Sequence, residues 1–353
     1  MMYIDVALTG FIATFFSIFV VRHLCDKLDI VDHPGGRKDH AGVIPLAGGP
    51  SLLLSLIIAH YLGFLNSHPA IMLAACLLIL IGIWDDRFGV RALTKFLAQL
   101  ASAALIVIGG GIVVTNIGVG LINELSGNYM VAIVVTIVAV TGLINAFNMI
   151  DGIDGLCSGL ALTCLGFILI SLTFNNSGLD PNLLKRLVFV AAAICVFLAF
   201  NLGLIPRRKI FLGDSGSMLL GLILSASLIQ VAEGQLSDYS YFPSSLVLWS
   251  VTVPVFDTLA TASRRILRGV SPMSPDRTHI HHIIMLLGLS PRQTLAAILA
   301  ISAILYVFGL TVTLNFGDSL ATIAWFLTFI IYYVAIGRAR KKYKETAISG
   351  FTS

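Results

Sequence analysis

Five aspartates stand at the ends of apolar segments, where a charged side chain is costly unless it is paired, hydrated or bound to a metal. Two of them are adjacent, so their charges repel each other unless a cation lies close by. Hard oxygen ligands beside basic residues suit Mg²⁺ and a phosphate-bearing substrate. The pattern predicts a phosphoryl-transfer site, in which metal and protein cations stabilise developing negative charge. The five are Asp85, Asp86, Asp151, Asp154 and Asp214.

Two asparagines precede one of these aspartates at a regular spacing. Asn145, Asn148 and Asp151 follow one another at intervals of three, which places them within an arc of roughly 120° on one helix face. Gly152 and Gly155 then end the helix and allow the backbone to approach a ligand closely. The alternative is that the three side chains are polar contacts between membrane helices.

Other polar groups leave alternatives open. Asp85 and Asp86 also fit an N-cap and first turn of a helix. The histidines at 279, 281 and 282 fit a solvated loop or an adventitious metal site, and neutral imidazoles prefer softer metals than Mg²⁺. Asp257 fits a proton relay, or a structural pair with a basic residue near the membrane interface, which we favour.

The elements that carry these residues are membrane helices. Of the 353 residues 57% are apolar and only 11% are charged, and mean hydropathy is +0.95. This composition excludes intrinsic disorder and an ordinary soluble enzyme. We predict an all-α polytopic membrane protein, with a single integral-membrane domain over 1–341 and a short cytoplasmic tail over 342–353. About eleven apolar segments approach the length needed to span a bilayer: 3–22, 43–65, 70–84, 96–115, 129–147, 156–174, 187–205, 217–233, 244–262, 294–314 and 319–337.

Basic residues predict the orientation. With eleven spans, 20 of the 22 Lys and Arg fall on one side, and only Lys185 and Arg186 fall on the other. The positive-inside rule makes the crowded side cytoplasmic, with the N-terminus outside and the C-terminus in the cytoplasm. All the aspartates described above then face the cytoplasm. The net charge of +4 follows from this topology and from anionic lipid headgroups, so no nucleic-acid partner is expected.

Five motifs, in order along the chain, resemble the polyprenyl-phosphate N-acetylhexosamine-1-phosphate transferases. The similarity covers essentially the whole sequence. Its bacterial branch specific for N-acetylglucosamine is the most similar, on Pro254-x-x-Asp257-Thr258 and on the run from Asp276 and Arg277 to His282. The five motifs are His40…Pro45…Gly48-Gly49, Asp85-Asp86 with Lys95, Asn145-x-x-Asn148-x-x-Asp151-Gly152-x-Asp154-Gly155-Leu156, Phe211-x-Gly213-Asp214-x-Gly216-Ser217, and His279-Ile280-His281-His282.

The resemblance implies a reaction and a set of residue roles. N-acetylglucosamine 1-phosphate would pass from UDP-GlcNAc to undecaprenyl phosphate in the bacterial inner membrane, releasing UMP, as the first membrane step of surface polysaccharide synthesis. Asp85, Asp86, Asp151 and His279 would be catalytic, with Asp85 or Asp86 holding or deprotonating the lipid phosphate. Asp214 and Asn148 would bind Mg²⁺, or Mn²⁺ in its place. The substrate contacts would be Lys95 on phosphate, Asp154 and Phe211 on the uracil, and Asn145 at a place that the resemblance leaves open. The sugar-phosphate end would meet Arg265, His279, His281 and His282.

Alternatives remain at three levels. The donor could be another UDP-N-acetylhexosamine or UDP-MurNAc-pentapeptide. The reaction could pass through a phospho-aspartate, although direct attack is favoured because a phosphate monoester is already anionic near pH 7. A transporter or flippase is the competing class, but transporter sites usually lie near the bilayer midplane rather than at one surface. A homodimer is left open.

Overall fold

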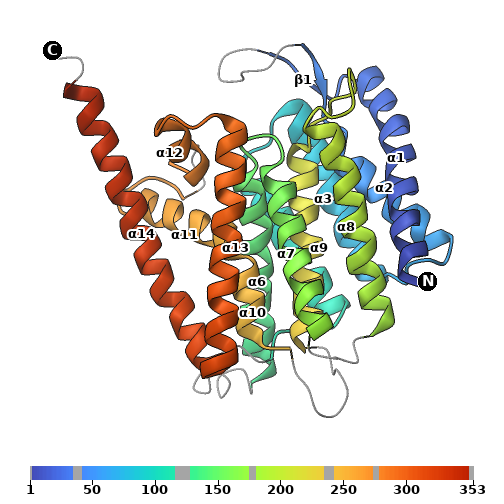
Figure 1. The fold of residues 1–353 in the computed structure, drawn as a ribbon. Helices are drawn as coiled ribbons and strands as arrows, with labels where there is room; N and C mark the ends of the chain where they lie inside the picture. Colours follow the sequence, from blue (N-terminus) through green and yellow to red (C-terminus); the bar gives the residue numbers. More distant parts are fainter. Residues whose placement is uncertain are drawn as a thin grey trace.

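The fold is a bundle of membrane helices with one small two-stranded sheet (Figure 1). The computed structural model describes residues 2–34, 42–115, 128–174, 180–233, 242–272 and 278–349. The sheet pairs β1 (Val31–Asp32) with β2 (Ile44–Pro45) in antiparallel register. The helices are α1 (Met2–Leu28), α2 (Gly48–Tyr61), α3 (Pro69–Phe88), α4 (Ala92–Ala104) with the π-helical turn η1 (Leu105–Gly109), α6 (Tyr129–Ile150), α7 (Leu156–Phe174), α8 (Pro181–Asn201), α9 (Gly213–Glu233), α10 (Ser244–Ser250), α11 (Thr252–Ile266), α12 (Ile280–Leu286), α13 (Pro291–Phe316) and α14 (Asp318–Ser349).

The chain is a multi-pass membrane protein, but the predicted count of eleven crossings is higher than the structure supports. Each of the eleven predicted segments contains a helix. Within the described residues, eight helices are long and apolar enough to cross a bilayer, and a ninth crossing requires the bent pair α10 and α11. Helix α2 has 14 residues, so it measures only about 21 Å against a hydrocarbon core of about 30 Å. The sequence pattern overestimates such spans because apolar residues in the flanking turns extend the hydrophobic run.

The ninth predicted segment is broken rather than straight. Helices α10 and α11 meet at Val251 with a bend of 70°. Pro254 lies in the first turn of α11, where its missing N–H costs no helical hydrogen bond. The break turns α11 sideways across the bundle, below α12 (Figure 1). Asp257 and Arg265 of α11 thereby meet His279, which directly precedes α12.

Helix α9 is the centre of the bundle, with 94% of its membrane-length window buried. Small residues allow its neighbours to approach closely. A Cβ atom on Gly49 of α2 would lie 2.4 Å from the Gly216 nitrogen, and one on Gly82 of α3 would lie 2.3 Å from the Ser215 Cα. These contacts fix α2 and α3 against the first turn of α9, which carries Asp214.

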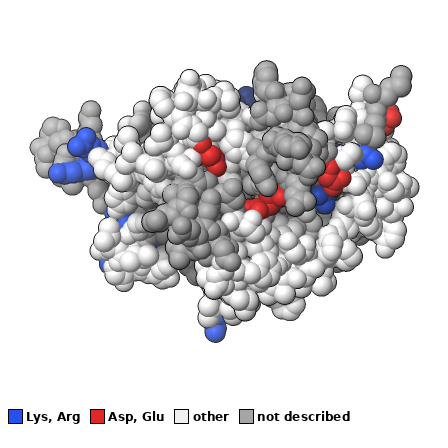
Figure 2. All heavy atoms as spheres, turned by 90° about the horizontal axis from the view of Figure 1, so that it is seen from below, with Lys and Arg blue, Asp and Glu red and all other residues white. Residues whose placement is uncertain are grey.

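The two ends of the bundle differ. The sheet and α12 lie at the upper end in Figure 1, and the N- and C-termini lie at opposite ends. The lower face, viewed in Figure 2, shows scattered charged side chains on a mostly uncharged surface. The backbone of α14 remains helical through Ser349, beyond Lys342, where the sequence predicts that the tail begins.

Candidate active site

One lysine joins two of the predicted aspartates at the upper end of the bundle. The Lys95 ammonium group, on the first turn of α4, lies 2.6 Å from an Asp85 carboxylate oxygen at the end of α3. It also donates a hydrogen bond to Asp214 at the start of α9. Asp85 accepts a further bond of 2.6 Å from the Val90 backbone N–H in the α3–α4 turn. The turn therefore places two carboxylates and one ammonium group in contact.

Asp86 has a different set of contacts from its neighbour. It accepts hydrogen bonds from the Asp214 backbone N–H at 2.9 Å and from the Ser215 hydroxyl at 3.1 Å. A carboxylate at this place satisfies free N–H groups and interacts favourably with the positive end of the helix dipole. The alternative that Asp85 and Asp86 begin their own helix is wrong, because both lie in the last turn of α3. Asp86 instead caps α9 from a neighbouring helix.

Helix α6 adds an amide and a third carboxyl group. The Asn148 nitrogen donates to the Ser217 hydroxyl at 2.9 Å, so its amide oxygen is the atom available to a ligand. Asp151 directly follows the last helical residue, Ile150, as the predicted helix end requires. Asp151 is an exposed residue, although protein atoms crowd around its carboxyl group and desolvate it. This desolvation, together with the charges of Asp214, Asp86 and Asp154, raises the pKa of Asp151 well above that of an ordinary aspartate.

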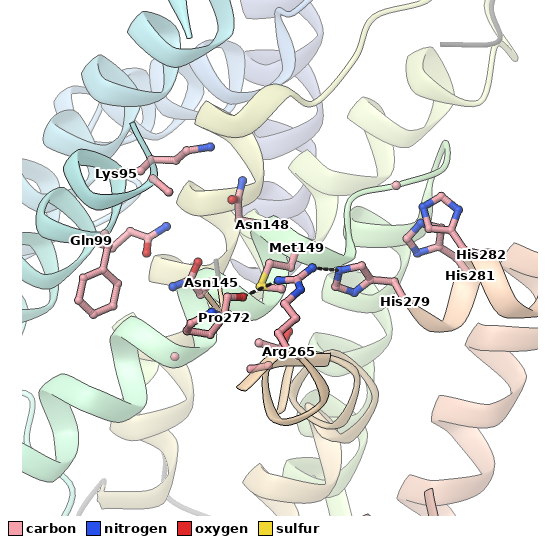
Figure 3. A pocket seen from close by; sticks show the side chains of 16 residues that line it. Lys95, Gln99, Asn145, Asn148, Met149, Arg265, Pro272, His279, His281 and His282 are labelled. Atoms are coloured by element: carbon pink, nitrogen blue, oxygen red, sulfur yellow. Dashed lines mark hydrogen bonds between the residues drawn. The ribbon is translucent and has the colours of Figure 1, made fainter. Parts of the chain in front are cut away.

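A cavity of about 440 Å³ opens beside this acidic cluster, which we define as Asp85, Asp86, Asp151 and Asp214 with Lys95. Figure 3 shows Lys95 and Gln99 of α4 on one side and the histidines on the opposite side. Asn145 and Asn148 of α6 lie between them. The cavity thus brings residues of the second, third and fifth sequence motifs to one place.

The far wall of the cavity is basic or titratable. Arg265 is 3% exposed, and its guanidinium donates to the Pro272 carbonyl oxygen. A second guanidinium nitrogen lies 3.5 Å from His279 Nε2. His279 is also buried, and its Nδ1 lies 2.7 Å from Asp257. The alternative of a solvated histidine loop is therefore wrong for His279.

His281 is the least satisfied polar side chain of this wall. It is 2% exposed, and neither ring nitrogen has a hydrogen-bond partner among the described residues. Burial and the neighbouring His282 lower its pKa to about 3, so the ring is neutral at pH 7. The Nε2 atom packs on Gly152, where a Cβ atom would lie only 2.1 Å away. An unpartnered polar ring in a cavity wall indicates a polar ligand.

Two predicted uracil contacts form a separate group. Asp154 pairs with Lys209 at 2.5 Å, and the same ammonium group lies 5.1 Å from the centre of the Phe211 ring. Neither Asp154 nor Phe211 lines the cavity. His40, Asp276 and Arg277, which contribute to the sequence resemblance, lie outside the described residues.

The donor set fits a divalent cation that is shared with substrate. Among the described residues, no three His, Cys, Asp or Glu side chains converge as a complete metal cage. Mg²⁺ does not need one, because it commonly uses one or two carboxylates, several waters and substrate phosphates. Repulsion from the neighbouring carboxylates adds to the desolvation that raises the pKa of Asp151, and an added cation would relieve this repulsion.

Sequence reasoning missed two parts of the site. Gln99 lines the cavity and donates to the Met218 sulfur at 3.4 Å. Tyr332 of α14 donates to Asp257 at 3.2 Å. A glutamine and a tyrosine within apolar helices resemble ordinary helix contacts, so no local signal distinguishes them.

Comparison with known proteins defines the class. The profile of glycosyl transferase family 4 matches residues 68–232, which include the acidic cluster. The chain is 32% identical over 345 residues to the undecaprenyl-phosphate alpha-N-acetylglucosaminyl 1-phosphate transferase of Escherichia coli K12, covering 94% of this chain and 90% of that protein. The chain belongs to this family of membrane transferases.

Other relatives carry similar names. The transferase of the same name from Yersinia pestis is 35% identical over 334 residues, covering 91% of this chain and 88% of the relative. The decaprenyl-phosphate N-acetylglucosaminephosphotransferase of Mycobacterium tuberculosis is 35% identical over 321 residues, covering 83% and 78%.

Proposed function

We propose that this enzyme transfers N-acetylglucosamine 1-phosphate from UDP-GlcNAc to undecaprenyl phosphate, giving undecaprenyl-diphosphate-GlcNAc and UMP. The observation that carries the proposal is the Lys95 bridge between Asp85 and Asp214, beside a cavity whose opposite wall holds Arg265 and three histidines. This arrangement offers cationic side chains to a diphosphate and carboxylates to a divalent cation that would accompany it, at a membrane helix end. The names of the relatives support the donor sugar and the lipid acceptor.

The transfer forms one bond and breaks one. An oxygen of the lipid phosphate attacks the β-phosphorus of UDP-GlcNAc. The bond from that phosphorus to the oxygen bridging the two phosphates breaks, and UMP leaves with the oxygen. Lys95 and Arg265 stabilise the charge that develops on the phosphoryl oxygens. Asp85 holds Lys95 in place, and Asp86 holds the first turn of α9.

The ion pair with Lys95 favours direct attack over a phospho-enzyme. A carboxylate whose oxygen is bound to an ammonium group is a weaker nucleophile than a free one. Both Asp85 and Asp214 are held in this way. The lipid phosphate needs no such activation, because it is already anionic near neutral pH.

A divalent cation, Mg²⁺ with Mn²⁺ as a substitute, completes the site. The acidic cluster contains four carboxyl groups and one ammonium group, so a nucleotide diphosphate would be repelled without an additional cation. Asp214 and the Asn148 amide oxygen would hold the ion, which supplies Lewis-acid stabilisation of phosphate charge when bound. Asp154 and Phe211 would contact the uracil after the Lys209 ammonium group moves away from the Phe211 ring.

The membrane setting fits these substrates. We place the upper end of the bundle in the cytoplasm, where UDP-GlcNAc is found, and the protein in the bacterial inner membrane. The residues 1–341 form the catalytic domain. The product would be the lipid-linked first sugar of an O-antigen or similar surface polymer, and a homodimer is compatible with this arrangement.

Release of UMP tests the proposal. The purified protein is incubated with undecaprenyl phosphate, Mg²⁺ and, side by side, UDP-GlcNAc, UDP-GalNAc and UDP-MurNAc-pentapeptide. We expect UMP from UDP-GlcNAc, loss of that UMP with EDTA, and recovery on adding Mg²⁺. UMP from the pentapeptide donor alone would assign the enzyme to cell-wall synthesis. No UMP from any donor, with a folded protein, would favour the transporter class.

A further inference from the structure

Asp257 is a buried carboxyl group that the proposed reaction does not use. It lies on α11 and is 0% exposed. A carboxyl group without access to water is stable only when its oxygens are hydrogen-bonded. Asp257 accepts from the Ile280 backbone N–H at 2.8 Å and from the Tyr332 hydroxyl at 3.2 Å, and its other oxygen lies 2.7 Å from His279 Nδ1. Its partners come from both α12 and α14.

These contacts hold one histidine at two points. Asp257 binds the His279 ring with one oxygen and the backbone of the next residue with the other. An ionised carboxylate only accepts hydrogen bonds, so Nδ1 carries the proton in this contact. His279 Nε2 lies 3.5 Å from the Arg265 guanidinium at the cavity wall, and because a guanidinium only donates hydrogen bonds, Nε2 accepts with its free electron pair.

We propose that Asp257 is a positioning residue that fixes the tautomer and orientation of His279, and through it the place of the Arg265 guanidinium in the cavity. The inference rests on the proposed function for its consequence in catalysis. A carboxylate that orients an imidazole without touching substrate is a known device of enzyme sites, where replacement by the amide imposes the wrong tautomer. Tyr332 extends the arrangement to α14, since its hydroxyl fixes the Asp257 oxygen that also holds Ile280.

The groups around the His279 ring include two charged side chains and a second imidazole. Asp257 and Arg265 face it from α11, and the His281 ring lies nearly parallel to it with centroids 5.9 Å apart. Tyr332 faces it only through Asp257. Asp257 is therefore the one acidic group in direct contact with the ring among the described residues.

Asp257→Asn tests the proposal, because the amide keeps the size of the side chain but offers N–H to Nδ1. We expect turnover to fall by at least about tenfold in UMP release, in a protein whose thermal melting confirms folding. His279→Gln and the double variant complete a cycle. If Asp257 acts through His279, UMP release by the double variant is no lower than UMP release by His279→Gln alone. Tyr332→Phe removes one of the three hydrogen-bond contacts of the Asp257 carboxylate, so UMP release should fall less than in Asp257→Asn.

Asp318→Asn is the matched control. Asp318 also accepts a bond from a backbone N–H, that of Ser245 at 2.8 Å, but at the other end of α14. Its variant should release UMP within twofold of the unmodified enzyme. Full turnover in folded Asp257→Asn, or multiplicative losses in the double variant, would overturn the proposal.

A spectrum of the unmodified enzyme gives an answer that does not depend on any variant's activity. In protein labelled with ¹⁵N-histidine, the signals of His279 are identified as those that are absent from the spectrum of the His279→Gln variant. We expect a protonated Nδ1 and an unprotonated Nε2 at neutral pH, and the reverse in Asp257→Asn. A proton on Nε2 alone in the unmodified enzyme would overturn the inference, even if Asp257→Asn fails to fold. Absence of UMP from the unmodified enzyme would instead count against the proposed function.

Discussion

At the scale of single residues, the site depends on pairs that lie far apart in the chain. Lys95 and Asp214 are separated by 119 positions, and Asp86 and Ser215 by 129. Aspartates at the ends of apolar segments are identifiable from sequence, because ionisable groups there are rare and functional. Which lysine meets which aspartate is not, because no local pattern encodes a contact across so many residues.

His281 makes folding stability depend on pH. The unfolded chain binds a proton on this ring below about pH 6.5, whereas the folded protein does so only near pH 3. Unfolding therefore takes up a proton within this window, and stability falls as pH decreases. At pH 5 the loss is about 2 kcal/mol relative to pH 7.5. Thermal melting at both pH values should show a smaller acid shift in His281→Asn. Equal shifts in the variant and the unmodified protein would contradict the burial of a neutral ring.

Gly152→Ala tests the contact between two sequence motifs. The new methyl group would meet His281 Nε2 at 2.1 Å, so the ring must move out of its place in the cavity wall. Misplacement by about 1 Å can reduce turnover by about 100-fold. We expect a loss of at least about tenfold in UMP release. Gly166→Ala on α7 is the matched control, since nothing lies within 4 Å of its Cβ position, and it should remain active. Activity retained in Gly152→Ala would mean that His281 needs no fixed position.

At the scale of elements, the first turn of α9 is the structural centre of the site. It carries Asp214, packs against Gly49 and Gly82, and receives its cap from Asp86 of α3. The sequence predicts both apolar segments and the polar residues at their ends. It does not predict that one helix would cap another, because capping rules describe residues adjacent to the helix they cap.

Replacing the cap should affect stability through α9. Asp86→Ala removes the acceptor of the Asp214 N–H and should lower stability by about 1 kcal/mol, a typical value for a lost cap. Asp86→Asn keeps an acceptor oxygen and should melt closer to the unmodified protein. Asp180→Ala, which removes the cap of α8 at the opposite end of the bundle, provides the comparison. It should lower the melting temperature and leave UMP release intact. Identical melting of Asp86→Ala and the unmodified protein would show that the cap contributes nothing.

The bend between α10 and α11 shows where a hydropathy pattern fails. A run of apolar residues from 244 to 262 predicts one straight span, but the helices meet at 70°. Pro254 was a visible signal of the new helix start. The pattern could not show that the bend carries Asp257 beneath His279, since that depends on how α12 and α14 pack against it.

At the scale of the whole molecule, the termini lie at opposite ends of the bundle (Figure 1). We predict that the C-terminal end is cytoplasmic. A green fluorescent protein fused to the C-terminus should fluoresce, because it folds in the cytoplasm. An alkaline phosphatase joined after Asp180 should be active, because that loop would face outward, and one joined after Lys209 should be inactive. The opposite pattern would place the acidic cluster away from cytoplasmic UDP-GlcNAc and contradict the proposed function.

Transfer of the β-phosphate tests the central claim most directly. The enzyme receives undecaprenyl phosphate, Mg²⁺ and UDP-GlcNAc labelled with ³²P in the β-phosphate, and the lipid phase is separated from water. Attack on the β-phosphorus predicts that the label enters the lipid with the sugar, and that Asp214→Ala abolishes this transfer. Label that stays in water as UDP, while the sugar enters the lipid, would show simple sugar transfer and contradict the account of this site.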